Sequence, residues 1–173
     1  TYIKASSETN LNVGDPNNNN VRIDATAVKA DVIVEGANLG CTQKARIEFN
    51  QLGGRLNTDA IDNSAGVNMS DIEVNLKILL QMLIQQKLIK NQEGRNALLK
   101  SMTDNVTELC LENNQHQHRL ISMDHIRSKE HFHIYKDLIG MLIKRNIVNA
   151  SREHITEKEI IMYETQSKGL PRP

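Results

Sequence analysis

Aromatic residues are scarce in this chain of 173 residues, which has no tryptophan, two phenylalanines and three tyrosines. Because 39% of the residues are nonetheless hydrophobic, the core must be built from leucine, isoleucine, valine and methionine. Long apolar runs are also missing, since the most apolar stretch, residues 78–84, contains Gln81. A membrane span needs about 20 apolar residues, so we expect no membrane partner. The length suggests one domain, or one domain with a smaller appendage.

Cysteine is scarce too, and neither sign of charge is in excess. Cys41 and Cys110 lie far apart without a second ligand at metal-binding spacing, which excludes a disulfide framework and is typical of a reduced, cytoplasmic protein. Lysine plus arginine and aspartate plus glutamate number 21 each, so no overall field favours nucleic acid. The histidine pairs at 116 and 118 and at 131 and 133 would point to different faces of a helix, so we expect no metal site.

A glycine-rich phosphate loop is likewise absent. The chain has no Gly-x-Gly-x-x-Gly and no loop ending in Lys-Ser or Lys-Thr, so the pyrophosphate of any bound dinucleotide would lie outside this segment. The chain also begins at Thr1 without methionine, shows no signal peptide, and stops at Pro173 in mid-pattern. We therefore expect it to be a piece of a longer polypeptide.

A strand–helix–strand pattern is present over residues 31–58. Residues 31–34 are β-branched and apolar, Thr42 can cap a helix over residues 43–52, and two glycines end that helix before a second strand over residues 55–58. The length suits one βαβ unit, whose strands are parallel. We predict an α/β fold, with a partial Rossmann-like parallel sheet followed by a mostly helical C-terminal region.

Loops of small residues follow both predicted strands, Glu-Gly-Ala-Asn-Leu-Gly at residues 35–40 and Asp-Asn-Ser-Ala-Gly-Val at residues 62–67. Parallel strands bring their carboxyl ends to one edge, where ligands bind in open α/β sheets. We therefore predict that Asn38 and Asn63 face one crevice, where their amides can donate and accept hydrogen bonds. Shaping the two turns would explain these asparagines equally well. Glu35 could be an acid or base, or a carboxylate that stabilises its turn.

Hydrophobic residues recur at helical spacing after residue 70. Ser70 and Glu73 have the spacing of a capping box, so Ser70 either caps this helix or binds an anion at its start. Apolar residues surround this helix almost completely, which predicts burial between layers. Further helices are predicted at residues 98–109, at residues 129–145 and from Thr156.

Other segments carry weaker expectations. Residues 1–20 are polar and rich in asparagine, and we predict a mobile loop there. Three isolated basic residues are interpreted as solvated or capping charges: Arg46, Arg55 and Lys77.

At its two loops the chain resembles the glutamate dehydrogenases. Residues 34–38 are similar to the Glu-Gly-Ala-Asn signature of the amino-acid dehydrogenase superfamily, residues 63–67 to its Asn-Ala-Gly-Gly-Val loop, and residues 70–73 to its Ser-Tyr-x-Glu. Ala65 and Asp71 depart from that pattern. Residues 1–8, 55–59 and 169–173 look like the large bacterial NAD-specific glutamate dehydrogenases.

The resemblance implies NAD as the cofactor, contacted by Gly36, Asn38 and Asn63. It implies L-glutamate and 2-oxoglutarate as substrate and product, with Ser70 and Asn63 binding the substrate. The family's catalytic lysine and aspartate would lie upstream, so it implies no catalytic residue in this segment and an inactive fragment in isolation. The full enzyme would be a homo-oligomer that moves a hydride from glutamate to NAD, giving an iminium that water converts to 2-oxoglutarate and ammonia.

The resemblance also implies a division of the chain and leaves two alternatives. Residues 1–69 would be the C-terminal part of the NAD-binding Rossmann-like domain, and residues 70–173 a helical region packing on it. One alternative is a dehydrogenase of another amino acid, although Ser70 favours a substrate that carries a carboxylate. The other is a non-catalytic helical interaction or regulatory module, because residues 90–173 offer packing stripes without identifiable chemistry.

Overall fold

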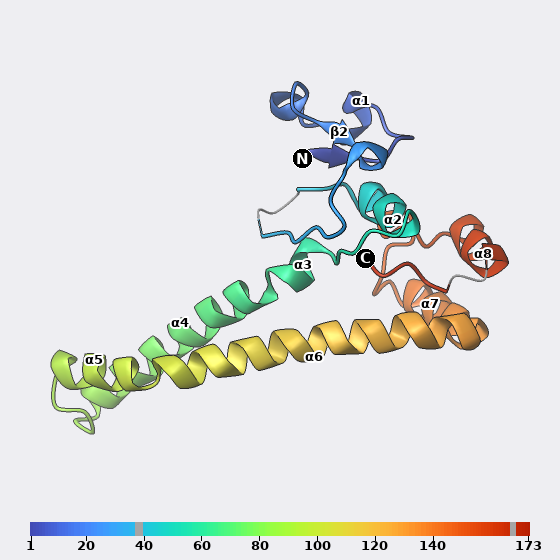
Figure 1. Cartoon of the computed structure of the whole chain (residues 1–173). Coiled ribbons are helices and arrows are strands. Elements are labelled where there is room, and N and C mark those ends of the chain that lie inside the picture. Colours follow the sequence, from blue (N-terminus) through green and yellow to red (C-terminus); the bar gives the residue numbers. More distant parts are fainter. Residues whose placement is uncertain (37–39, 167–168) are drawn as a thin grey trace. The chain divides into compact units, whose positions relative to one another are not determined.

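The computed structural model describes residues 1–36, 40–166 and 169–173, in which helices predominate over strands (Figure 1). The strands form one small parallel sheet. In chain order the elements are β1 (Ile3–Lys4), α1 (Asn10–Val13), η1 (Pro16–Asn18), β2 (Ile23–Asp24), η2 (Ala25–Ala27), α2 (Gln43–Gln51), α3 (Asp59–Asp62), α4 (Ser64–Gln85), α5 (Gln92–Ser101), α6 (Thr103–Glu130), α7 (Phe132–Lys144) and α8 (Glu157–Gln166).

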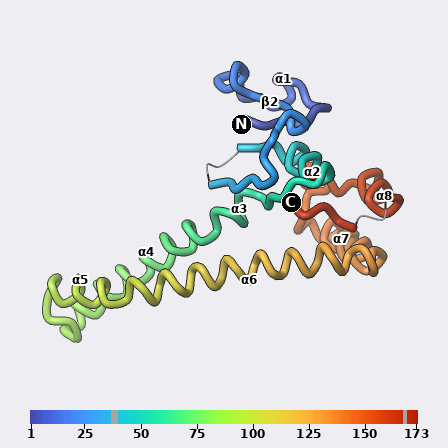
Figure 2. The backbone as a smooth tube through the Cα atoms, viewed as in Figure 1, coloured from blue at the N-terminus to red at the C-terminus, as the bar shows by residue number. Residues whose placement is uncertain are grey.

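The chain divides into two compact units, whose backbone can be followed in Figure 2. One consists of residues 1–60 and 119–173, and the other of residues 61–118. Helix α6 contributes residues to both. The predicted division between residues 69 and 70 falls inside α4, and as a statement about domains it stays a prediction.

Parallel pairing in the first unit is short. Ile3 of β1 pairs with Ile23 of β2, and a single bridge joins Ile3 to Cys41. The predicted strands at residues 31–34 and 55–58 meet in one parallel bridge, Val32 with Arg55, on either side of α2. The parallel direction is confirmed, but the described residues do not extend this bridge into a Rossmann-like sheet.

Helix α2 begins at the predicted residue with the predicted caps and ends at Gln51, one residue before the predicted end. The Thr42 hydroxyl accepts a hydrogen bond from the Ala45 amide at 3.1 Å, and Gly53 adopts φ +98°, the left-handed conformation that favours glycine. A Cβ on Gly54 would lie 2.2 Å from the Phe49 ring, so the second glycine lets the chain pass close to that ring. This helix builds the core of the unit, which consists of Ala25, Cys41, Ala45, Phe49 and Leu56.

The first 20 residues are not the loop that the sequence predicts, since they contain β1, α1 and the short 3-10 helix η1. The fully buried Arg22 guanidinium explains why this segment is ordered. It donates to the Thr1 carbonyl at 3.0 Å, to the Asp15 carbonyl at 2.5 Å and to Asn10 Oδ1 at 2.9 Å. The Arg22 side chain thus joins polar groups from three places in this polar segment.

The helices of the second half differ from prediction at their boundaries and in their burial. Helix α4 begins at Ser64, six residues before the predicted start at Ser70. Its apolar residues are not enclosed, because Val74, Ile78 and Met82 are 50–55% exposed. The single helix expected over residues 98–109 is divided between α5 and α6.

The last two helices agree with the sequence pattern. Helix α7 lies within the range predicted for it, and α8 begins at Glu157, directly after Thr156. The Thr156 amide donates to Glu159 Oε2 at 2.9 Å, which is one arm of the predicted capping box. No helix in the described ranges has the length and apolarity needed to cross a membrane.

The C-terminal segment, residues 169–173, lies against the rest of the first unit through specific hydrogen bonds. The Leu170 amide donates to Ser128 Oγ at 2.9 Å, and the Leu170 carbonyl lies 2.8 Å from His125 Nδ1. The Arg172 side chain donates to Asn57 Oδ1 and to Ser122 Oγ, both at 2.8 Å. This segment therefore links the chain just beyond the Val32–Arg55 bridge to helix α6.

Candidate functional site

The first candidate loop is closed at its base by the Glu35 carboxylate. Glu35 Oε1 accepts from the Cys41 amide at 3.0 Å, so the residues at either end of the loop contact each other. A Cβ on Gly40 would lie 3.0 Å from the same oxygen, which explains a glycine there. Glu35 is 5% exposed. The interpretation of this residue as a carboxylate that stabilises its turn agrees with these contacts.

Arg46 of α2 supplies the charge that Glu35 needs in this buried position. Its Nε lies 2.5 Å from Glu35 Oε2 and its Nη2 lies 3.0 Å from Oε1, the two-point geometry of a strong ion pair. Burial, the largest single effect, lowers the pKa of Arg46, but the hydrogen bond and the charge of Glu35 outweigh it and raise that pKa above its usual value. The prediction of a solvated or capping Arg46 is therefore wrong, because its partner lies across the loop.

Within the loop, Gly36 is described and Asn38 lies outside the described residues. No described atom lies within 4 Å of the position that a Cβ would occupy on Gly36. Packing against the described residues therefore does not require a glycine at this position. The space beside the backbone is compatible with close approach of a ligand.

Asn63, the second candidate, is the residue directly before α4. It is the N-cap of that helix by position, with φ −90° and ψ 2°, but its side chain makes no capping hydrogen bond. Its carbonyl accepts from the amides of Gly66 and Val67 at 3.1 and 3.3 Å. A Cβ on Gly66 would lie 3.1 Å from Asn63 Oδ1, so this glycine leaves room for the asparagine amide.

Ser70 is exposed on α4 and is not the cap that the sequence predicts. The helix begins earlier because the Asn63 carbonyl accepts its first backbone hydrogen bonds and because Ala65 and Met69 are good helix formers. Residues three and seven positions apart share a helix face, so Asn63, Gly66 and Ser70 lie on one side of α4. At 1.5 Å per residue, Asn63 and Ser70 are about 10 Å apart along the axis.

The candidate residues are distributed over both compact units. Gly36 belongs to the unit formed by residues 1–60 and 119–173, whereas Asn63 and Ser70 belong to residues 61–118. The structure brings Asn63 and Ser70 onto one helix face. The crevice predicted to join Asn38 and Asn63 stays a prediction.

Nucleophilic and metal chemistry find little support in the described parts of the chain. Burial, and then the charge of Glu35, raise the pKa of the Cys41 thiol to about 12, so it stays protonated near neutral pH and is a poor nucleophile. No group of three or more histidine, cysteine, aspartate or glutamate side chains there could hold a metal ion.

Sequence reasoning missed contacts that position the candidate residues. Arg46 is one example, and Asn114 of α6 is another, since its Nδ2 donates to the Ile61 carbonyl at 2.9 Å and to Ser64 Oγ at 2.7 Å, on either side of Asn63. Neither residue lies in a recognisable motif. Arg46 lies in the predicted helix over residues 43–52, whereas Asn114 lies outside the predicted helices, and no local pattern reveals a distant partner.

Residues 1–124 match the family described as bacterial NAD-glutamate dehydrogenase, catalytic domain. The chain is 44% identical to the NAD-specific glutamate dehydrogenase of Mycobacterium tuberculosis and 42% identical to that of Pseudomonas aeruginosa, with 100% and 99% of this chain covered. It is 37% identical to that of Halomonas elongata. The chain spans 11% of the length of each of these relatives. This chain therefore belongs to the bacterial NAD-glutamate dehydrogenase family.

Proposed function

We propose that this chain is part of the cofactor- and substrate-binding region of an NAD-dependent glutamate dehydrogenase. The full polypeptide would convert L-glutamate, NAD and water to 2-oxoglutarate, ammonium, NADH and a proton. The observation that carries this proposal is the 42–44% identity, over the whole chain, to two proteins named NAD-specific glutamate dehydrogenase. The catalytic lysine and aspartate of such an enzyme would be supplied by other parts of the polypeptide.

The described residues fit a role in holding NAD. Asn63 keeps its amide free of helix capping, Gly66 leaves room for that amide, and the space beside Gly36 would admit a ligand next to the backbone. When bound, NAD accepts the hydride that leaves the α-carbon of glutamate. Asn38 and Asn63 would orient the cofactor through amide groups that both donate and accept hydrogen bonds.

Ser70 and Asn63 would bind the substrate. The Ser70 hydroxyl would donate to the distal carboxylate of glutamate, and Asn63 on the same face of α4 would contact the part of the substrate nearer the cofactor. Holding the donor carbon and the acceptor in one geometry supplies much of the rate enhancement in such a reaction. The Rossmann-like arrangement of residues 1–69, the helical region of residues 70–173 and a homo-oligomeric enzyme are parts of the same proposal.

An activity assay on the full-length polypeptide that contains residues 1–173 tests the function. We expect oxidation of glutamate with NAD, and little activity with NADP or with branched-chain amino acids. Asn38→Ala and Asn63→Ala should each lower kcat/KM by tenfold or more, by the loss of roughly 1.5 kcal/mol or more of hydrogen bonding. Asn68→Ala, on a different side of α4, is the matched control. Unchanged glutamate turnover in both variants would contradict the proposed site.

One observation favours a second candidate, a helical interaction module. Residues 61–118 expose apolar side chains on α4, and an apolar groove of about 380 Å³ is lined by Met69, Leu76, Leu99 and Val106, among others. If the full-length polypeptide oxidises no amino acid with NAD or NADP, the helical interaction module replaces the dehydrogenase as the proposed function.

A further inference from the structure

Helix α6 contacts the chain on both sides of Asn63. The Asn114 amide nitrogen donates to the carbonyl of Ile61, two residues before Asn63, and to the hydroxyl of Ser64, one residue after it, at 2.9 and 2.7 Å. These contacts join positions 50 to 53 residues apart in the sequence. One side chain therefore ties the end of α3 to the start of α4.

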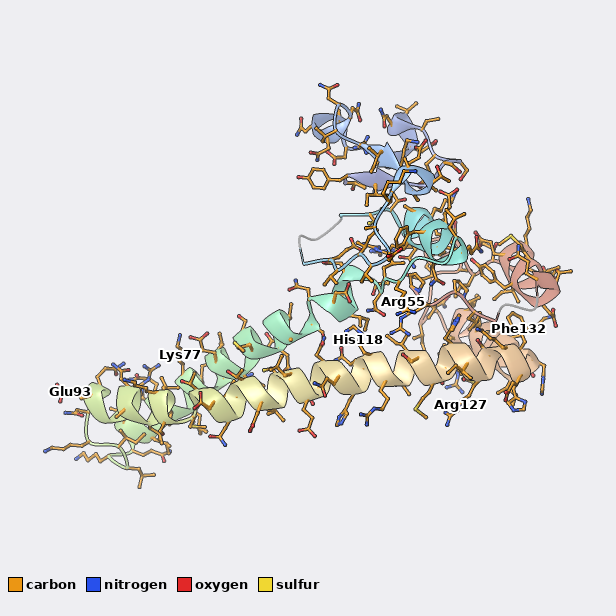
Figure 3. The ribbon with its side chains drawn as sticks, in the orientation of Figure 1. Arg55, Lys77, Glu93, His118, Arg127 and Phe132 are labelled. Atoms are coloured by element: carbon orange, nitrogen blue, oxygen red, sulfur yellow. The ribbon has the colours of Figure 1, made fainter. Side chains whose placement is uncertain are left out.

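A second side chain of α6 contacts the remaining neighbour of Asn63. His118 lies one turn beyond Asn114, on the same face of the helix, and Figure 3 labels it on α6. Its Nε2 is 3.9 Å from Asp62 Oδ1, and the Asp62 side chain is only 3% exposed. Residues 61, 62 and 64 are thus all held by α6, while the Asn63 side chain takes no part in capping α4.

The orientation of Asn63 depends on these contacts. Asn63 contributes only its carbonyl to the first turn of α4, and its own side chain does not fix the turn. The direction in which its amide points is set by the peptide units before and after it. Asn114 holds the Ile61 carbonyl before these units and the Ser64 side chain after them, with support from His118 at Asp62.

We propose that Asn114 is a positioning residue for Asn63. This inference rests on the proposed function, in which Asn63 contacts NAD and substrate. A displacement of about 1 Å at a reacting group can cost about a hundredfold in rate, so the loss of two hydrogen bonds beside Asn63 should be visible in kinetics. Asn114 makes no contact with substrate or cofactor and acts only through Asn63.

A double-mutant cycle in the full-length polypeptide tests this inference. Asn114→Ala should lower kcat/KM for glutamate by about tenfold, less than Asn63→Ala, with the melting temperature close to that of the parent. The double variant should be no slower than Asn63→Ala alone, because Asn114 has nothing left to position. Gln115→Ala, at an exposed neighbour on α6, should behave like the parent.

Each of the other outcomes shows whether the proposed role of Asn63 or the inference about Asn114 is wrong. If Asn63→Ala has normal activity, the proposed role of Asn63 fails and this inference fails with it. If Asn63→Ala is impaired but Asn114→Ala is normal, only the inference is overturned. It is also overturned if Asn114→Ala slows the Asn63→Ala enzyme by a further tenfold, since a general structural role would act in both backgrounds. Should Asn114→Ala not fold, Ser64→Ala removes one of the two acceptors and carries the same cycle, with a smaller expected loss.

Discussion

Glu35 and Arg46 form a buried ion pair that closes the loop between residues 35 and 41. Two guanidinium nitrogens of Arg46 contact the two carboxylate oxygens of Glu35, at 2.5 and 3.0 Å, and Cys41 donates its amide to the same carboxylate. The Arg46 side chain is 9% exposed and the Glu35 side chain is 3% exposed. Water therefore cannot replace either partner, and the geometry of this loop depends on both.

Removing Arg46 should loosen the loop. Breaking a buried ion pair on one side costs about 3–5 kcal/mol, because the remaining charge is left unpaired. In Arg46→Ala we expect faster hydrogen exchange at the Cys41 amide, measured by mass spectrometry on the full-length protein. Lys44→Ala, which removes an exposed cation from the same helix, is the control.

A second substitution separates the charge effect from a simple loss of packing. Glu35→Gln in the Arg46→Ala background removes the unpaired carboxylate, so exchange at Cys41 should be slower than in Arg46→Ala alone. Equal protection of Cys41 in Arg46→Ala and in the parent would mean that the pair does not hold the loop.

Ser70→Ala should affect substrate binding without destabilising α4. Ser70 lies inside the helix, where alanine is the better helix former, so we expect no loss of thermal stability. Loss of a hydrogen bond to a carboxylate costs about 1.5–3 kcal/mol, which predicts a KM for glutamate raised tenfold or more and an unchanged KM for NAD. Steady-state kinetics of the full-length enzyme, with Asn75→Ala as the control, measure both values. A lower melting temperature with a normal KM would show that Ser70 stabilises α4 and does not bind the substrate.

Arg172→Ala should release the C-terminal segment from the rest of the first unit. Its guanidinium donates to Asn57 and Ser122, and hydrogen bonds that involve a charged group contribute about 1.5–3 kcal/mol. Hydrogen exchange should rise in peptides that cover residues 55–58 and 169–173. Arg127→Ala removes an exposed arginine of α6 and should leave both peptides unchanged. Protection that stays at the parent's level in Arg172→Ala would show that this contact contributes no stability.

The first turn of α8 should weaken in mild acid. Burial, the largest single effect, raises the pKa of Glu159, but hydrogen bonds from Thr156 and the charge of His154 outweigh it and bring this pKa below the usual 4.5. The folded state thus favours the carboxylate, so its contribution is present above about pH 4.5 and is lost as the pH falls through the lowered pKa.

Hydrogen exchange across residues 156–163 as a function of pH measures this effect, after correction for the intrinsic exchange rate. Glu159→Gln should abolish the pH dependence, and Glu157→Gln should keep it. A parent protein whose protection stays constant from pH 6 to pH 3 would contradict the assignment to Glu159.

Features that depend on neighbours in the sequence were predictable. The Thr42 cap and the glycine at residue 53 identified α2 at both ends, and Thr156 with Glu159 identified the start of α8. The parallel direction of the Val32–Arg55 bridge followed from the length of the connection between the two segments. Ser70 shows the limit of such local rules, because its capping pattern lies within a helix that starts at Ser64.

The sequence by itself determined α2, α7 and α8, the parallel connection and, through its two short loops, the resemblance to glutamate dehydrogenases. These features arise from backbone hydrogen bonds and side-chain periods that span only a few residues. Only the tertiary structure decided that Glu35 pairs with Arg46, that Asn114 contacts Ile61 and Ser64 on either side of Asn63, and that Arg172 contacts Asn57. The physical reason is that the partner of a buried polar group is set by the path of the chain, and no local pattern encodes that path.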